Sequence, residues 1–137
     1  MKTVEWLIQF IDDYTCNGNQ DPPQLWGDDE FIQEKGISYL KNFESSDWNI
    51  LHKEWKNRSY PWIMCLIDLL YGVDNYKSQE LIVNIGLLGD DEETLDAMEC
   101  IQEFIEEIDV KVKEKLKQKT AEIIRDRMRK INLKKKD

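Results

Sequence analysis

At 137 residues, with 41% hydrophobic and 34% charged side chains, the chain is long enough for one sizeable core and too short for two. With only three Pro and six Gly, the composition favours a helix-rich domain over a disordered or all-β chain. The net charge is −9, but residues 1–109 hold 7 Lys+Arg and 24 Asp+Glu (net −17), whereas residues 110–137 hold 12 and 4 (net +8). An acidic body repels nucleic acid and anionic membranes and attracts basic proteins.

Hydrophobic periodicity and capping residues predict seven helices and no strand. The predicted helices cover approximately residues 3–15, 28–43, 45–57, 60–72, 78–88, 90–108 and 110–133. The segment 16–27 is expected to be a loop, because Pro22 and Pro23 remove backbone donors and impose an extended backbone. The fourth helix is apolar nearly all round from Trp62 to Leu70, which is typical of a central buried helix.

Short connections between these helices favour antiparallel neighbours. We therefore expect an all-α fold of about seven helices in stacked antiparallel hairpins, as an irregular bundle or a short HEAT-like solenoid. The whole chain, 1–137, is expected to be a single helical domain. It would end in a basic C-terminal helix, 110–133, followed by a short mobile tail, 134–137.

The apolar positions predict which side chains form the core. The most buried residues are expected in the fourth helix, at Trp62, Ile63, Leu66, Ile67 and Leu70. The last helix has a narrower apolar stripe, and it is expected to pack through Leu116, Ile123, Ile124 and Ile131. Gly36 is expected to weaken the middle of the second helix, which Asp28 or Asp29 would cap.

The sequence contains no pattern that predicts catalysis. The only histidine, His52, cannot form a catalytic triad or a histidine metal site by itself. The segment from Asp13 to Gly18 begins like a calcium loop, but Gln24 stands where a bidentate carboxylate should close the site. The three cysteines are odd in number and widely spaced, so we expect reduced thiols at Cys16, Cys65 and Cys100. We expect no enzyme activity and no cofactor.

The sixth helix carries an acidic stripe opposite its apolar side. Its carboxylates are Glu92, Asp96, Glu99, Glu103, Glu106 and Glu107. Like charges at i, i+4 each cost roughly 0.2–0.5 kcal/mol, so the stripe does not stabilise its own helix. A solvated face, neutralisation by the lysine-rich last helix folding back, and a partner-binding face are three open interpretations. The predicted contact residues are Glu92, Asp96, Glu99 and Glu103, together with Asp28, Asp29 and Glu30 beside Trp26.

Four segments carry a resemblance to a known group of proteins. They are SSDWNIL at 45–51, WKNRS at 55–59, the apolar helix 62–71 and the acidic run DDEETL at 90–95. Together they resemble the small all-α immunity proteins of bacterial contact-dependent and polymorphic toxin systems. The resemblance implies an inhibitor that occupies the basic cleft of a cognate toxin, such as a nuclease, with an acidic surface. It transfers no individual site residue.

Two other functional classes stay open. A helical regulatory module would contact nucleic acid or a partner protein through the basic C-terminal helix, whereas an enzyme would need a carboxylate-only metal site such as Asp28, Asp29 and Glu30. The acidic body opposes phosphate and no aromatic residue follows Phe104, so we do not expect nucleic acid, a membrane or a small molecule as partner. Because residues 1–15 lack the features of a signal peptide, we expect a cytoplasmic protein.

Overall fold

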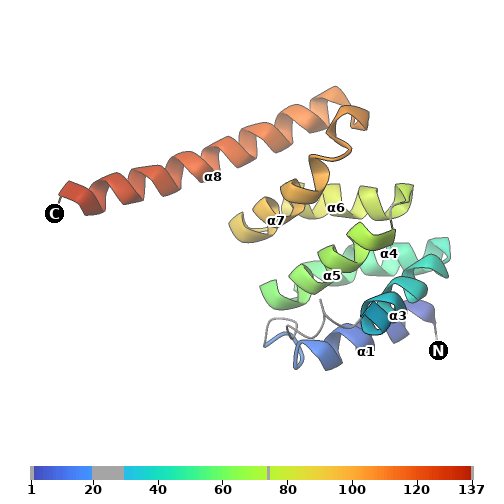
Figure 1. The fold of residues 1–137 in the computed structure, drawn as a ribbon. Helices are drawn as coiled ribbons and strands as arrows, with labels where there is room; N and C mark the ends of the chain where they lie inside the picture. The colour runs from blue at the N-terminus through green and yellow to red at the C-terminus, as the bar shows by residue number, and fades with distance from the viewer. Residues whose placement is uncertain (1, 20–29, 74, 137) are drawn as a thin grey trace. The chain divides into compact units, whose positions relative to one another are not determined.

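The computed structural model describes residues 2–19, 30–73 and 75–136, and all regular secondary structure within these ranges is helical. The α-helices are α1 (Thr3–Tyr14), α3 (Glu30–Lys41), α4 (Ser45–Glu54), α5 (Tyr60–Val73), α6 (Tyr76–Leu88), α7 (Asp91–Ile101) and α8 (Val110–Lys136) (Figure 1). Two short 3₁₀ helices follow α4 and α7, as η1 (Trp55–Asn57) and η2 (Ile105–Glu107). The predicted all-α fold of about seven helices is confirmed.

Contacts within the chain define two compact units, residues 1–82 and residues 83–137. The first unit contains α1, α3, α4, η1, α5 and the beginning of α6; the second contains the end of α6, α7, η2 and α8. A single folding domain stays a prediction. No helix in the described part of the chain is long and apolar enough to cross a membrane.

In the first unit, α5 is the central helix. Its predicted core residues are confirmed, because Trp62, Ile63, Leu66, Ile67 and Leu70 are each at most 3% exposed. α1 and α3 both contact α5 and also contact each other. They contribute buried side chains that include Val4, Leu7, Phe10, Ile11 and Leu40. A helix that is apolar nearly all round needs such cover on several sides, and α5 receives it.

The middle of α3 passes very close to its neighbours at Gly36. A Cβ atom built on this glycine would lie 2.8 Å from Phe10 Cε1 and 2.8 Å from Leu69 Cδ2. The glycine has a low helix propensity, as the sequence indicates, but its missing side chain allows α3 to approach α1 and α5.

Asp47 links the beginnings of α1 and α4. Its Oδ1 accepts a hydrogen bond from the backbone N–H of Val4 at 3.3 Å, and its Oδ2 accepts one from Glu44 N–H at 2.9 Å. Asp47 is only 4% exposed, and its bond from Val4 N–H is buried, while its bond from Glu44 N–H is partly buried. The predicted start cluster at 45–47 therefore lies inside the helix, and Glu44 occupies the N-cap position.

The segment that begins like a calcium loop forms the turn at the end of α1. Thr15 Oγ1 donates to the carbonyl oxygen of Ile11 at 2.8 Å and accepts from Gly18 N–H at 3.0 Å. Gly18 has a φ of +84°, in the left-handed region that glycine adopts without strain. Hydrogen bonds within the turn therefore use the Thr15 hydroxyl. The rest of the expected loop, including Gln24, lies outside the described residues.

Asp12 connects α1 to the segment that leads into α5. Its Oδ1 accepts hydrogen bonds from Trp62 Nε1 at 3.0 Å and from Arg58 Nη1 at 3.2 Å. The Arg58 guanidinium lies 5.0 Å from the centre of the Trp62 ring, within range of a cation–π contact. This group of side chains satisfies the indole N–H of a core tryptophan.

Two predicted helix boundaries need correction. α6 begins at Tyr76, earlier than the predicted start at Ser78, because Asn75 Oδ1 accepts from Ser78 N–H at 2.8 Å and so caps the helix. The sixth helix does not continue to Ile108: α7 ends at Ile101, and η2 follows after a turn. Like charges at 99/103 and 103/107 disfavour a helix through this segment, which is consistent with its early end.

α8 is a 27-residue helix that contacts α7 along part of its length. The predicted packing of Leu116 and Ile123 is confirmed, since they are 0% and 5% exposed. The same prediction is wrong for Ile124 and Ile131, which are 51% and 47% exposed, because they lie on a different face of the helix. α8 also continues to Lys136, beyond the predicted end at residue 133, and residue 137 lies outside the described range.

Candidate functional site

α7 begins with the capping box that its sequence predicts. Asp90 Oδ1 accepts from Glu93 N–H at 3.0 Å, and Glu93 Oε1 accepts from Asp90 N–H at 3.2 Å. Burial raises the pKa of the Glu93 carboxyl above its ordinary value, although the hydrogen bond from the Asp90 backbone acts in the opposite direction. This capping box fixes the start of α7 after the turn that follows α6, and so it fixes the direction in which the acidic side chains of α7 project.

A lysine of α8 closes the C-terminal end of α6. Lys119 Nζ donates to the carbonyl oxygens of Gly86 at 3.1 Å, Leu87 at 3.0 Å and Gly89 at 2.7 Å. The last carbonyls of a helix have no partner within the helix, so the ammonium supplies the missing donors. Burial lowers the pKa of Lys119, while nearby carboxylates at the start of α7 act in the opposite direction.

The packing beneath this lysine is close. A Cβ atom on Gly86 would lie 3.1 Å from Leu116 Cδ2 and 3.3 Å from Ile101 Cδ1. Thr94 Oγ1 donates to the carbonyl oxygen of Gly86 at 3.0 Å, so polar and apolar contacts meet at one point. The contacts around Leu116 therefore fix the position of α8 in this unit and its rotation about its own axis.

Two ion pairs join α8 to the acidic segment before it. Arg127 pairs with Glu92 at the start of α7, and Lys113 Nζ lies 2.9 Å from Glu106 Oε2 in η2. The hydrogen bond from Lys113 holds the pKa of the Glu106 carboxyl below its ordinary value. For these two acidic residues, the interpretation that the last helix folds back and neutralises them is confirmed.

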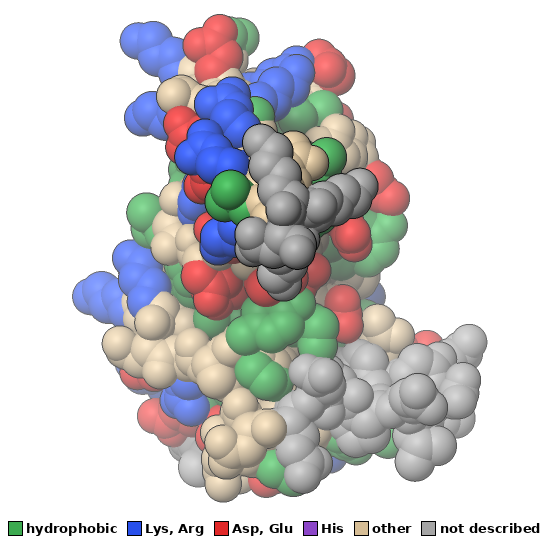
Figure 2. Space-filling view, turned by 90° about the vertical axis from the view of Figure 1, so that its left-hand side faces the viewer, with side chains coloured by type: hydrophobic (Ala, Val, Ile, Leu, Met, Phe, Trp, Pro, Cys, Tyr) green, Lys and Arg blue, Asp and Glu red, His purple; other side chains and the backbone are tan. Residues whose placement is uncertain are grey.

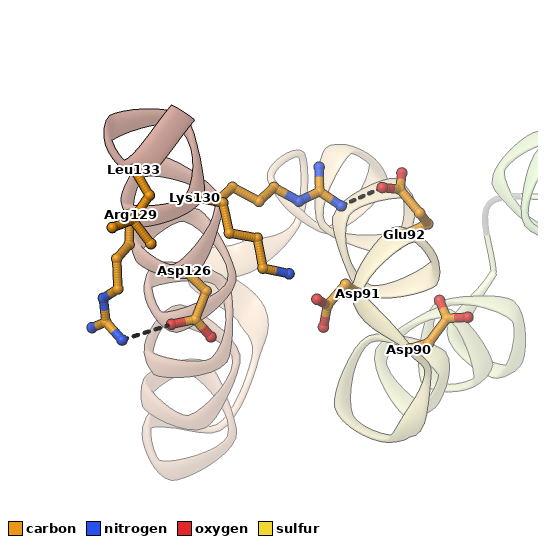
Figure 3. A pocket seen from close by; sticks show the side chains of 8 residues that line it. Asp90, Asp91, Glu92, Asp126, Arg129, Lys130 and Leu133 are labelled. Carbon is orange, nitrogen blue, oxygen red and sulfur yellow. Dashed lines mark hydrogen bonds and ion pairs between the residues drawn. The ribbon is translucent and has the colours of Figure 1, made fainter. Parts of the chain in front are cut away.

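An open hollow of about 830 Å³ lies between the first turn of α7 and the C-terminal half of α8. Its lining residues are Asp90, Asp91, Glu92, Asp126, Arg127, Arg129, Lys130 and Leu133. Figure 3 shows Lys130 extending from α8 toward Asp91, while Arg129 turns back to Asp126 on its own helix. Both signs of charge line the hollow, so it suits ion pairing between the two helices better than the binding of a charged ligand.

The structure divides the predicted contact residues into three groups. Glu92, Asp96 and Glu99 share one face of α7, at i, i+4 and i+7. Glu103 is exposed but lies in the turn after the helix, so the predicted stripe is not continuous. Trp26, Asp28 and Asp29, and the side chain of Glu30, lie outside the described residues. The carboxylate-only metal site proposed from these residues lies there too.

Burial shifts the pKa of two titratable groups in the first unit, His52 and Cys65. His52 is partly buried, and desolvation lowers the pKa of its imidazole below 6.5 against the opposing effect of Glu80. Burial raises the pKa of the Cys65 thiol, which therefore stays protonated at neutral pH. Within the described ranges, no group of three His, Cys, Asp or Glu side chains could hold a metal ion.

The exposed apolar face of α8 is a feature that the predicted core did not identify. Ile124, Met128 and Ile131 are 47–52% exposed and follow one another at i, i+4 and i+7. In the sequence, this second apolar face is indicated by the adjacent pair Ile123-Ile124. Neighbours in a helix are about 100° apart, so the two side chains cannot face the same partner. Charged side chains gather around this helix in Figure 2, which looks toward its C-terminal end.

Comparison with known proteins identifies no relative: no family model, no curated protein and no solved structure matches the chain.

Proposed function

We propose that this protein is an immunity protein that binds and inhibits a cognate bacterial toxin with a basic surface, such as a nuclease. The observation that carries this proposal is the acidic face of α7. Residues 90–109 contain ten Asp and Glu and no Lys or Arg. Arg127 and Lys113 of α8 pair with Glu92 and Glu106, and the side chains of Glu99 and Glu103 are exposed to solvent.

Electrostatics supports a protein partner for this face. Carboxylates that repel one another along a helix contribute nothing to the stability of that helix. The same carboxylates attract a basic surface at long range and raise the rate of association. An acidic face of this kind therefore contributes more to a complex with a basic partner than to the stability of the free protein.

Packing of apolar side chains would supply the affinity. Leu88 is 57% exposed and lies directly before the Gly89–Asp90 turn, next in sequence to the acidic start of α7. An exposed apolar residue beside charges is typical of the centre and rim of a protein interface. We propose that Leu88 packs against the toxin while Glu99 and Glu103 meet its basic side chains.

Inhibition by occlusion requires no active site or cofactor in the inhibitor. The protein would meet its toxin in the cytoplasm, where free thiols such as those of Cys16, Cys65 and Cys100 are maintained. The predicted second contact, formed by Trp26, Asp28, Asp29 and Glu30, belongs to the same proposal and would enlarge the acidic surface.

The test is binding to the product of the neighbouring gene, measured by surface plasmon resonance at low and high salt, together with protection of cells that express it. Replacing Glu99 and Glu103 by Lys should leave the fold intact and slow association by about ten-fold at low salt. The matched control replaces Glu114 and Glu122 of α8 by Lys, which changes the charge by the same amount elsewhere.

Two results would count against the proposal. If the wild-type protein does not bind that gene product, the inhibitor function is wrong. If the variant with Lys at positions 99 and 103 associates at the rate of the wild type while the control variant associates more slowly, the acidic face of α7 is not the contact surface.

A further inference from the structure

The C-terminal half of α8 presents an apolar row that its own unit does not cover. Ile124 is 51% exposed, Met128 is 52% exposed and Ile131 is 47% exposed. Their i, i+4, i+7 spacing places all three within about 60° of one another around the helix. We call these three side chains the α8 row.

The rotation of α8 is fixed by other contacts, so the row cannot turn inward within this unit. Leu116 and Ile123 are buried, and Lys119 and Arg127 reach α6 and α7 from the same side of the helix. Ile124 lies about 100° away from Ile123. Rotating the row inward would break both polar contacts and expose Leu116 and Ile123.

Basic and neutral side chains border the row. Between Lys117 and Leu133, Lys117 lies in line with the row and Arg125 lies beside it, about 60° around the helix from Met128, whereas the two acidic residues of this stretch, Glu122 and Asp126, project from the opposite side. Asp126 pairs there with Arg129. An apolar row with a positive border complements an apolar row with a negative border.

From these observations we propose that the α8 row is a docking site for an acidic amphipathic helix of a partner protein, which lies along α8. Its apolar side chains pack on Ile124, Met128 and Ile131, and its carboxylates meet Lys117 and Arg125. This surface differs from the acidic face of α7 in position and in sign of charge, so the inference does not depend on the proposed inhibitor function.

The row fits other occupants less well. A symmetric contact with α8 of a second copy would place positive borders opposite each other, which is destabilising. Nucleic acid would use the basic side chains but would leave three apolar side chains against phosphates. A membrane-binding helix needs a broad apolar face, whereas this row is narrow.

The experiment titrates the full-length protein into a fluorescein-labelled peptide and follows fluorescence anisotropy at low salt. The peptide has three heptads with leucine at a and d and glutamate at e and g, and a lysine-for-glutamate version is the charge control. We expect the acidic peptide to bind and the basic one not to bind. The double variant Ile124→Ser/Met128→Ser should weaken binding by about ten-fold or more.

Matched variants on the other side of α8 separate docking from general damage. Leu133 is also exposed, at 59%, but lies half a turn from Ile124, so Leu133→Ser should bind like the wild type. Arg125→Gln should weaken binding several-fold, and Arg129→Gln, which removes the same charge on the side of Asp126, should have a smaller effect.

Several results would overturn the inference. Absence of acidic-peptide binding to the wild type, or equal binding by the Ile124→Ser/Met128→Ser variant, would exclude this docking site. Row-dependent binding of duplex RNA or of phosphatidylserine vesicles, without peptide binding, would assign the row to those ligands. A wild-type dimer in sedimentation analysis that the double variant abolishes would assign it to a second copy of the chain.

Discussion

Lys119 on α8 donates a hydrogen bond to the carbonyl oxygen of Gly89 at 2.7 Å, across 30 residues of sequence. The same ammonium also reaches two other carbonyls at the end of α6. The Lys119 side chain thus joins the turn between α6 and α7 to α8. The C-terminal cap of α6 therefore depends on a residue that belongs to another helix.

Replacing Lys119 by Met should destabilise the protein. The variant keeps the apolar stem but removes the ammonium that donates to three carbonyl oxygens, of which Gly86 keeps the hydrogen bond from Thr94. We therefore expect a loss of about 1–2 kcal/mol in the free energy of unfolding. Urea denaturation monitored by circular dichroism measures it. Lys117→Met, at an exposed position on the same helix, is the control and should be nearly neutral. Equal stability of the two variants would contradict the capping role.

Asp47→Ala should weaken the connection between α1 and α4. It leaves the backbone N–H groups of Val4 and Glu44 without their acceptor, and the loss should be about 1–3 kcal/mol because Asp47 is buried. Asp47→Asn keeps one acceptor oxygen and should lose less. The midpoints of thermal unfolding of the two variants show which one loses more stability. If Asn is as damaging as Ala, the charge rather than the acceptor geometry is what matters.

Gly36→Ala should destabilise the first unit although alanine favours helices. Helix propensity predicts a gain of about 1 kcal/mol for this change. The added methyl group would meet Phe10 and Leu69 at 2.8 Å, and such overpacking costs about 1–3 kcal/mol. We therefore expect a lower midpoint of thermal unfolding. Lys35→Ala, at an exposed position of α3, is the control, and a Gly36→Ala variant more stable than it would refute the close approach.

Acidification should destabilise the protein partly through His52. Its pKa is lowered by burial in the folded state, and the charges that also act on it are Glu80, Lys77 and Lys56. The unfolded chain therefore takes up a proton near pH 6.5 while the folded chain does not. Stability falls as the pH drops through 6.5, until the lowered pKa is reached. Urea midpoints between pH 7.5 and pH 5 measure this slope, which should be smaller in His52→Gln. An unchanged slope would exclude His52 as a contributor.

The helices and the innermost core could be predicted from the amino-acid sequence, because both depend on local pattern. A stretch such as Trp62 to Leu70 has no polar face to expose, so it must be covered whatever its neighbours are. The capping box of Asp90 and Glu93 could also be predicted, since both partners lie within one turn. The acidic residues on the outer face of α7 followed from the same periodicity.

The choice of which apolar residues of α8 are covered, and the residue at which α7 ends, depend on tertiary contacts. Periodicity predicts that Ile123 and Ile124 belong to apolar rows, but it does not determine which row meets a neighbour. That choice depends on contacts distant in sequence, namely the Lys119 cap and the space that Gly86 leaves for Leu116. The same contacts pair Glu92 with Arg127 and leave Glu99 exposed, because a helix can bring only one of its faces to its partner.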